Sequence, residues 1–236
     1  MSKTTILYQH GTLALLVPGL FRGTMRMGDL LTHGDTGIGT GEGLDGELLI
    51  LDGTPYQVTS DGVVHVVDDE FLLPFASVHH AAFKPLMTVE DVSADDLEAL
   101  ILEQGHFANT FFAVTVKGTF TCMTTRAVAR NMAPDATLAS AAENQSQFVA
   151  DHVSGTLLSY YSPELFNGAA VGGFHAHFLT EDQSMGGHVL QYDVEKADVA
   201  IQLFDTLEQH LPTSDPDFMA HDFSNDDVNG VIKKAE

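Results

Sequence analysis

Hydrophobic and polar residues alternate along most of this chain of 236 residues, with the two-residue period that is typical of β-strands. Residues 47–51 form an apolar segment that ends at an Asp-Gly pair, which predicts a strand followed by a turn. A second Asp-Gly pair, at 61–62, separates the segments 56–58 and 63–67, and this arrangement is typical of a tight β-hairpin. The pattern therefore indicates a strand-rich protein.

Three later regions extend this pattern. Residues 111–116 and 119–125 flank a Lys-Gly pair, and we expect them to form another hairpin. Residues 155–161 predict a further strand. In residues 197–211 the apolar side chains recur both every two and every four residues, so periodicity alone allows either a strand or a helix there.

Few segments have the spacing of helices. Ser93 is a favourable N-cap for a helix that continues to about Gln104, with aspartates in its first turn and Gly105 after its end. Its predicted core-facing residues are Leu97, Leu100 and Ile101. A second helix is expected to begin at Ser224. Its predicted buried residues are Val228, Val231 and Ile232.

The segment from Phe174 to His188 places three histidines in a pattern that a metal ion can use. In a strand, His175 and His177 share one face, while the apolar residues around them point to the other face and into a core. Residues 180–185 are polar and are followed by Gly-Gly, which predicts a hairpin loop. If the returning strand places His188 opposite His177, the three imidazoles meet on one face of a two-stranded ribbon.

Three protein ligands with an open fourth position are typical of a catalytic zinc site rather than a structural one. The alternative is that two of the three are ordinary surface histidines on a half-buried strand. The apolar alternation and the Gly-Gly turn favour the metal site, so we expect Zn²⁺ on a C-terminal β-ribbon. Cys122 is the single cysteine, so no intramolecular disulfide can form, and we expect a buried apolar role for it.

Charge narrows the classes of partner. The chain has 33 acidic and 10 basic residues, which gives a formal net charge of -23 at pH 7. Nucleic acids and anionic membranes both attract clustered Lys and Arg, so we expect neither as a partner. No apolar segment approaches the length of a membrane span, and the first residues do not resemble a signal peptide, so we expect a cytoplasmic protein.

Three further residues are candidates for chemistry. Glu47 begins an apolar strand, so its carboxylate would project from a strand end; a solvated structural acid is the alternative. Arg126 stands out in a chain with few arginines and could bind a carboxylate, although pairing with one of the many acids is equally consistent with the sequence. Glu236 is the last residue and, taken alone, indicates only an exposed terminus.

Four segments together resemble the signatures of the alpha-acetolactate decarboxylase family. They occur in the family's order, and the resemblance extends from about Gly11 to Glu236. The segments are Gly39-Thr40 with 44–47, Tyr56 with Asp61-Gly62, Thr125-Arg126 with Val128, and 173–178 with 186–189. The histidine segment is the most specific of the four.

The resemblance implies a role for each matched residue. The implied zinc ligands are His175, His177 and His188; the implied catalytic residues are Glu47, Arg126 and Glu236; and the implied substrate-binding residues are Thr40 and Arg126. The implied reaction is decarboxylation of 2-acetolactate to acetoin and CO₂ through a metal-stabilised enediolate that is protonated stereospecifically, as a step of acetoin biosynthesis. The resemblance also favours strand for residues 197–211 and is compatible with a homodimer.

Two other functions stay open on the residues alone. One is a zinc hydrolase that uses the same three histidines, and the other is a non-catalytic module that binds a metal or a small molecule. For the fold we expect the α+β class, with two packed mixed or antiparallel β-sheets and few helices. We expect one unit over residues 1–236, with an N-terminal sheet in 1–118 and a metal-bearing sheet in 119–236.

Overall fold

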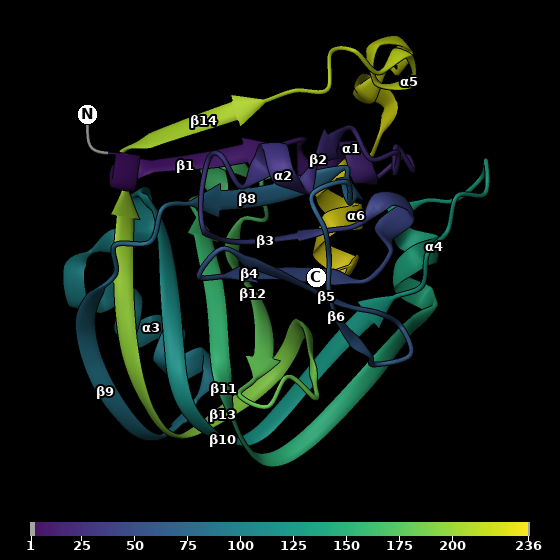
Figure 1. Ribbon diagram of the computed structural model, residues 1–236. Helices are drawn as coiled ribbons and strands as arrows, with labels where there is room; N and C mark the ends of the chain where they lie inside the picture. Colours follow the sequence, from purple (N-terminus) through teal and green to yellow (C-terminus); the bar gives the residue numbers. More distant parts are fainter. Residues whose placement is uncertain (1–2, 236) are drawn as a thin grey trace.

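The computed structural model describes residues 3–235 and consists of two large β-sheets that pack against each other (Figure 1). The strands of the first sheet are β1 (Ile6–His10), β3 (Thr36–Thr40), β4 (Glu47–Leu51), β5 (Thr54–Val58), β6 (Val64–Val66), β8 (Phe75–His79) and β14 (Thr206–His210). Their order is β14-β1-β8-β3-β4-β5-β6. The sheet is mixed, because β1 runs parallel to β14 and antiparallel to β8.

The second sheet contains the long strands. They are β9 (Lys84–Ser93), β10 (Phe111–Val128), β11 (Gln145–Ser162), β12 (Gly173–Thr180) and β13 (Gly186–Phe204), in the order β10-β11-β12-β13-β9. Strand β10 pairs with β13 as well as with β11, so β10, β11, β12 and β13 form a closed ring of antiparallel pairs. A separate small ribbon consists of β2 (Met25–Arg26) and β7 (Leu72–Leu73).

Helices are short and lie around the sheets. They are α1 (Leu13–Leu16), α2 (Met27–Leu30), α3 (Ala94–Gly105), α4 (Leu138–Glu143), α5 (Pro216–Ala220) and α6 (Val228–Ala235). Short 3-10 turns are η1 (Lys3–Thr5), η2 (Glu42–Leu44), η3 (Phe107–Asn109), η4 (Glu164–Phe166) and η5 (Phe223–Asn225). Helix α6 contacts α1 and α4 beside the first sheet (Figure 1). The strand-rich α+β class is therefore confirmed.

Three of the four apolar clusters in the described residues matter for the position of the site, since burial of apolar area is the main favourable term in folding. One lies between the two sheets and includes Leu49 of β4 and Leu158 of β11. A second joins the ring of long strands to α3 through Phe120 and Leu97. A third joins α1, α4 and α6, with Ile232 buried in it. The third cluster lies beside the pocket described below.

Several expected elements form as predicted. The Asp-Gly hairpin joins β5 to β6, and residues 197–210 lie in β13 and β14, apart from Asp205; Leu211 follows the end of β14. Helix α3 begins after Ser93, whose hydroxyl oxygen accepts a hydrogen bond from the backbone N–H of Asp96 at 3.3 Å. It ends at Gly105, and His106 then takes the left-handed conformation, with φ of 55°.

The hairpin expected around residues 117–118 is wrong. Strand β10 is continuous there, and Gly118 lies opposite Gly155 of β11 and Ala197 of β13. A Cβ atom at Gly118 would lie 2.1 Å from the carbonyl oxygen of Lys196. The glycine therefore permits close approach of a neighbouring strand and does not form a turn. The expected boundary between sheets at 118/119 falls inside this strand; the chain passes between the sheets at 80–83, and β14 returns to the first sheet.

Two details of the helices also differ from expectation. Leu100 is 45% exposed, because α3 covers the sheet with the narrower face that contains Leu97 and Ile101. Helix α6 begins at Val228 rather than at Ser224, since Asp226 has an extended backbone that separates η5 from the helix. The carboxylate of Asp227 accepts a hydrogen bond from the N–H of Gly230 and so caps the later start.

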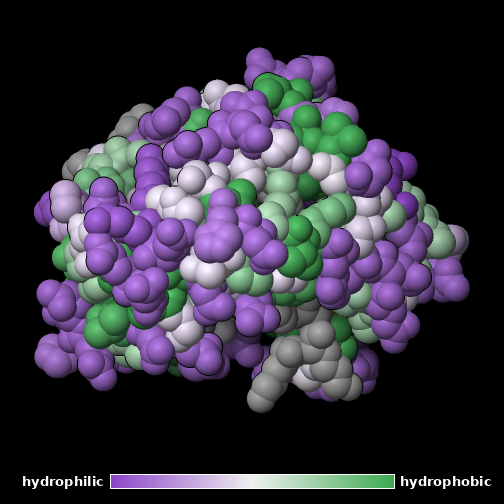
Figure 2. Space-filling model, turned by 90° about the horizontal axis from the view of Figure 1, so that it is seen from below, coloured by the Kyte–Doolittle hydropathy of each residue, from purple (hydrophilic) through white to green (hydrophobic). Residues whose placement is uncertain are grey.

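Most of the visible surface is polar, although 44% of the residues in the chain are hydrophobic (Figure 2). Figure 2 shows polar residues over most of one face, with hydrophobic residues in small separate patches. Within residues 3–235, none of the helices combines the length and apolar character needed to cross a membrane.

Candidate metal centre

The histidine ribbon is formed by the end of β12 and the start of β13. The register pairs His177 with His188, Phe178 with Gly187 and Leu179 with Gly186, which confirms the predicted pairing of His177 with His188. Gly187 has a φ of 127°, and a Cβ atom there would lie 2.5 Å from the carbonyl oxygen of Arg126 on β10. The second glycine of the turn therefore lets β10 approach the ribbon closely.

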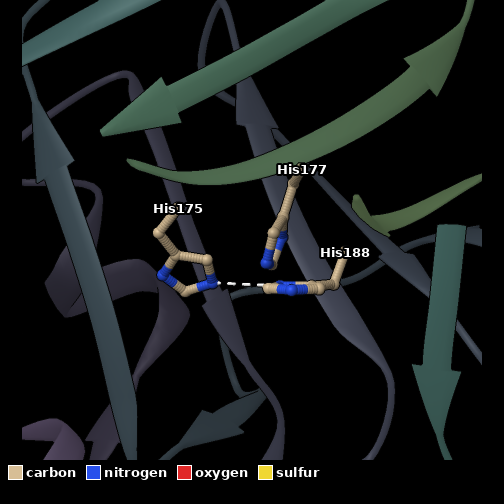
Figure 3. Close-up of side chains that lie close together, drawn as sticks. All are labelled: His175, His177 and His188. Carbon is tan, nitrogen blue, oxygen red and sulfur yellow. Dashed lines mark hydrogen bonds between the residues drawn. The ribbon is translucent and has the colours of Figure 1, made fainter. Parts of the chain in front are cut away.

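The imidazoles converge as the alternation predicts. Phe178 is fully buried in the core on the opposite face, while the three rings face one another (Figure 3). Their centroids lie 4.9 to 5.5 Å apart. Nε2 of His175 lies 3.1 Å from Nδ1 of His188. One ring nitrogen from each of His175, His177 and His188 lies within 4.8 Å of the others.

The orientation of His177 is fixed by the neighbouring sheet. Its Nδ1 lies 2.7 Å from the carbonyl oxygen of Leu48 on β4. A carbonyl can only accept, so Nδ1 carries the proton and Nε2 presents a lone pair. Within the described residues this Nε2 is buried with no hydrogen-bond partner, and it lies 3.5 Å from Oε2 of Glu47. A backbone carbonyl behind an imidazole is the usual way to orient a metal ligand.

Burial also favours the neutral form of the rings. Burial first, and Arg126 second, lower the pKa of His175 to about 3. The pKa of His177 is well below its usual range because of burial and then the neighbouring His175. Burial and then Arg126 hold the pKa of His188 well below its usual range as well. Neutral imidazole is the form that binds a metal ion, so the protein holds these side chains ready for coordination.

These residues fit a metal ion of the kind that imidazole prefers. Two nitrogens bound to the same tetrahedral ion at ~2.0–2.1 Å lie ~3.3 Å apart, close to the 3.1 Å between the ring nitrogens of His175 and His188. The unpartnered Nε2 of His177 supplies a third donor from the same side. Three imidazoles without a thiolate suit zinc, copper, iron or nickel, and they leave coordination positions for a substrate.

Glu47 and Arg126 lie beside the histidines although they come from different sheets. Nη1 of Arg126 lies 3.6 Å from Oε1 of Glu47, and the register places Arg126 opposite His188. Both side chains are buried, with exposed fractions of 8% for Glu47 and 6% for Arg126. The structure therefore brings a carboxylate, a guanidinium and three imidazoles into one pocket.

Comparison with known proteins assigns this arrangement to a family. Residues 7–225 match the family described as Alpha-acetolactate decarboxylase. Alpha-acetolactate decarboxylase of Lactococcus lactis subsp. cremoris is 36% identical over 100% of both chains. That of Methanosarcina mazei is 40% identical over 90% of this chain and 74% of the relative. The chain belongs to the alpha-acetolactate decarboxylase family.

Solved structures agree with the sequence comparison. A crystal structure of alpha-acetolactate decarboxylase from Bacillus subtilis matches with a TM-score of 0.92 and 32% identity, over 98% of this chain and 99% of that one. A Staphylococcus aureus protein described as similar to alpha-acetolactate decarboxylase matches with a TM-score of 0.94 and 34% identity, over 98% and 100% of the two chains. The fold of this family member is therefore that of its relatives over nearly its whole length.

The two remaining residues suggested by the family resemblance have different outcomes. The hydroxyl of Thr40 donates to the carbonyl oxygen of Gly46 at 2.8 Å, so Thr40 holds the loop that leads into Glu47 while lining the pocket. Glu236 lies outside the described residues. Helix α6, which precedes it, packs against the cluster that borders the pocket through Val228, Val231 and Ile232.

Sequence reasoning missed the apolar side of the pocket. Besides the polar residues and Gly39, the pocket is lined by apolar side chains from α1, η2, β8, β10 and α4. They are Leu13, Leu16, Leu44, Phe75, Val128, Leu138 and Ala142. No chemical signal marks such residues in a sequence, because leucines that face a ligand and leucines that face a core follow the same pattern.

Proposed function

We propose that this protein decarboxylates 2-acetolactate to acetoin and CO₂ with a Zn²⁺ ion held by His175, His177 and His188. The observation that carries the proposal is the convergence of three neutral imidazoles with buried Glu47 and Arg126 in one pocket. The names of the relatives supply the substrate. Glu47 and Arg126 both lie beside the histidines, and this favours a catalytic site. In a module that only binds a metal or a small molecule, we would expect the two residues to lie apart.

Decarboxylation of this substrate requires an electron sink at the ketone. 2-Acetolactate is a β-keto acid, so loss of CO₂ leaves an electron pair that must move onto the ketone oxygen. When bound, zinc would supply a Lewis acid for that oxygen. The chain's own contribution is to hold the imidazoles in the neutral form and to fix the ring of His177 through Leu48. These contacts form on folding, so the site is organised before the substrate arrives.

Arg126 has the chemistry to position the substrate. A guanidinium presents planar donors that match a carboxylate, and this one is buried, where a charge-assisted hydrogen bond is stronger than in water. Its Nη1 is 3.6 Å from Glu47, which holds the guanidinium beside the histidines. We propose that Arg126 orients the departing carboxylate of the substrate and that Thr40 shapes the neighbouring wall.

A protonated carboxyl group must then deliver a proton to the carbon that lost CO₂. Each turnover converts a carboxylate anion into CO₂ and a new C–H bond, so one proton is taken up. Glu47 lies 3.5 Å from Nε2 of His177, within reach of a substrate at the metal. We propose that Glu47 or Glu236 protonates one face of the enediolate and so sets the handedness of acetoin.

The proposal is tested by product analysis. Racemic 2-acetolactate is incubated with the protein as purified, after removal of metal by a chelator, and after addition of zinc, and acetoin and CO₂ are measured. We expect equal amounts of both products, only when zinc is present, and none from His177→Ala. Bound zinc without acetoin contradicts the decarboxylase and favours a hydrolase on the same histidines, which a panel of ester and amide substrates would then reveal.

Assembly and location form a separate part of the proposal. We propose a cytoplasmic homodimer whose partner is the small anionic substrate, without nucleic acid or membrane. The chain has 33 acidic and only 10 basic residues, and this charge supports the absence of nucleic acid and membrane as partners. Light scattering of the purified protein tests the homodimer, because a mass equal to one 25.4 kDa chain would contradict it.

A further inference from the structure

The pocket beside the histidines has two chemically different sides. One side contains the imidazoles, Glu47 and Arg126, while the other is formed by leucine, phenylalanine, valine and alanine. A substrate of the proposed kind divides in the same way. It has a carboxylate, a hydroxyl and a ketone that suit the polar side, and two alkyl groups that suit the apolar side. The match between the two divisions indicates where each part of the substrate lies.

Most of the apolar side belongs to a packed core. Six of its residues are at most 8% exposed and are members of one cluster: Leu13, Leu16, Leu44, Phe75, Val128 and Leu138. Ile232 of α6 is buried in the same cluster. Close-packed protein interiors have low compressibility, so we expect these six residues to keep their positions when a ligand binds. They form a fixed wall of the pocket.

Ala142, the seventh apolar residue of the pocket, differs from these six. It is half-buried, packs against the edge of the cluster, and has the smallest side chain among the apolar residues that line the pocket. It lies four residues after Leu138 in α4, so both side chains are on one face of the helix and both line the pocket. Ala139 lies on another face of the same helix and is exposed.

The helix that carries Ala142 is firmly placed. The hydroxyl oxygen of Thr137 accepts from the N–H of Ser140 at 3.2 Å, and Ser140 Oγ accepts from the N–H of Thr137 at 3.0 Å. This reciprocal cap satisfies the start of α4, and α6 packs against the helix. A larger side chain at residue 142 would therefore take up space in the pocket instead of displacing the helix.

We propose that Ala142 sets the largest alkyl group that the pocket accepts on the hydroxyl-bearing carbon of the substrate. The inference rests on the proposed function, since it assigns the apolar side to the alkyl groups of a 2-hydroxy-3-oxo acid. A single methylene in an apolar pocket changes kcat/KM by roughly ten-fold or more, so one residue on the apolar side is enough to separate a methyl substrate from an ethyl substrate.

The test compares Ala142→Leu with Ala139→Leu, which makes the same change on the exposed face of α4. Each zinc-loaded protein is assayed on 2-acetolactate and on its homologue in which an ethyl group replaces the methyl group on the hydroxyl-bearing carbon. We expect Ala142→Leu to lower kcat/KM for the ethyl substrate at least about ten-fold more than for the methyl substrate. Ala139→Leu should leave the ratio unchanged. Ala142→Val serves as the milder change if the leucine variant does not fold.

A binding measurement separates this inference from the proposed reaction. The reduced analogues of both substrates, in which a hydroxyl replaces the ketone, cannot lose CO₂ but keep the same alkyl groups. Calorimetry should show that Ala142→Leu weakens binding of the ethyl analogue more than that of the methyl analogue. Equal losses for both would overturn the role of Ala142. Absence of acetoin from the parent protein, with size-selective analogue binding intact, would contradict the reaction and leave the size limit standing.

Discussion

Two groups of neighbouring histidines in this protein, each with a fully buried member, differ in how their ring nitrogens are used. In the first sheet, Nδ1 of His10 lies 2.8 Å from Nδ1 of His210, and Nε2 of His10 lies 2.8 Å from the hydroxyl of Thr24. Both nitrogens of His10 are thus engaged by the protein. In the ribbon, Nδ1 of His177 is engaged by Leu48, but its Nε2 points toward the other two rings.

The comparison shows that proximity and burial of histidines do not by themselves make a metal site. His10 is fully buried, and burial followed by the charge of His210 lowers its pKa to about 4. Its two ring nitrogens are nevertheless both used for internal hydrogen bonds. The candidate metal centre is distinguished by three ring nitrogens that lie within 4.8 Å of one another, with Glu47 and Arg126 next to them. Each prediction below tests whether this difference is the one that matters.

The largest effect should come from His177→Ala. Removing one of three ligands abolishes tight metal binding, and we expect acetoin formation to fall by about 10⁴-fold or more, because the Lewis acid is lost with the metal. Metal content by mass spectrometry and initial rates measure both quantities. A variant that retains full zinc and activity would show that the histidines are structural.

Glu47→Gln should have the next largest effect. The amide keeps the shape of the side chain but can neither hold nor donate a carboxyl proton, so we expect kcat to fall by about 10²–10⁴-fold. Zinc content should be unchanged, since the three imidazoles remain. If kcat is retained, the proton donor is not Glu47, and the same measurement on Glu236→Gln then identifies the other candidate.

Arg126→Lys preserves the charge but removes the planar donors. We expect a loss of about 10–100-fold in kcat/KM, because an ammonium cannot bind a carboxylate through two parallel hydrogen bonds. The control is zinc content, which should match that of the parent protein. Unchanged kinetics would mean that Arg126 acts through its charge alone.

His10→Ala tests the other side of the comparison. The change removes a buried side chain and leaves Thr24 and His210 without their partner, so we expect a loss of about 2 kcal/mol in the free energy of unfolding. Zinc affinity and kcat should stay the same in the folded protein. Loss of zinc from this variant would show that the two histidine groups are coupled.

The last prediction concerns pH and another buried histidine, which is not part of either group. The hydroxyl of Tyr160 donates to the carbonyl oxygen of Thr36 at 3.2 Å, so Nδ1 of His79 donates to that hydroxyl oxygen at 2.7 Å. Burial lowers the pKa of His79 to about 3. A lowered histidine pKa means that the unfolded chain binds more protons, so this stability is present above about pH 6.5 and is lost as the pH falls toward 3. Replacing His79 by Phe should reduce the pH slope of unfolding free energy by about 1.4 kcal/mol per pH unit between about pH 6 and 4. Denaturant unfolding measures the slope, and an unchanged slope would contradict the assignment.

The sequence predicted the histidine ribbon because all of the information is local. Two-residue periodicity fixes the face of His175 and His177, and the turn before Gly186-Gly187 fixes the register of His188. Local patterns also predicted α3 and the hairpin of β5 and β6. Lys117-Gly118 resembles a turn in sequence, but Gly118 instead allows β13 to lie close to β10. This contact forms only in the folded ring of strands, so local sequence does not predict it.

The rest of the site depends on contacts between distant elements. Glu47 reaches the histidines only because β4 packs on β12 and β13, as the hydrogen bond from His177 to Leu48 shows. Periodicity says nothing about that packing, so the convergence of Glu47 and Arg126 rested on the family resemblance. The apolar wall with Ala142 had no sequence signal, since its residues follow the same pattern as any core.

A zinc titration of the metal-free protein tests the central claim most directly. Acetoin formation is followed as zinc is added, and X-ray absorption identifies the ligands of the bound ion. We expect activity to rise linearly to a maximum at one zinc per chain, with three imidazole nitrogens at ~2.0–2.1 Å. Full activity without zinc, or a bound zinc with fewer than three imidazole ligands, would contradict the assignment of the metal centre to His175, His177 and His188.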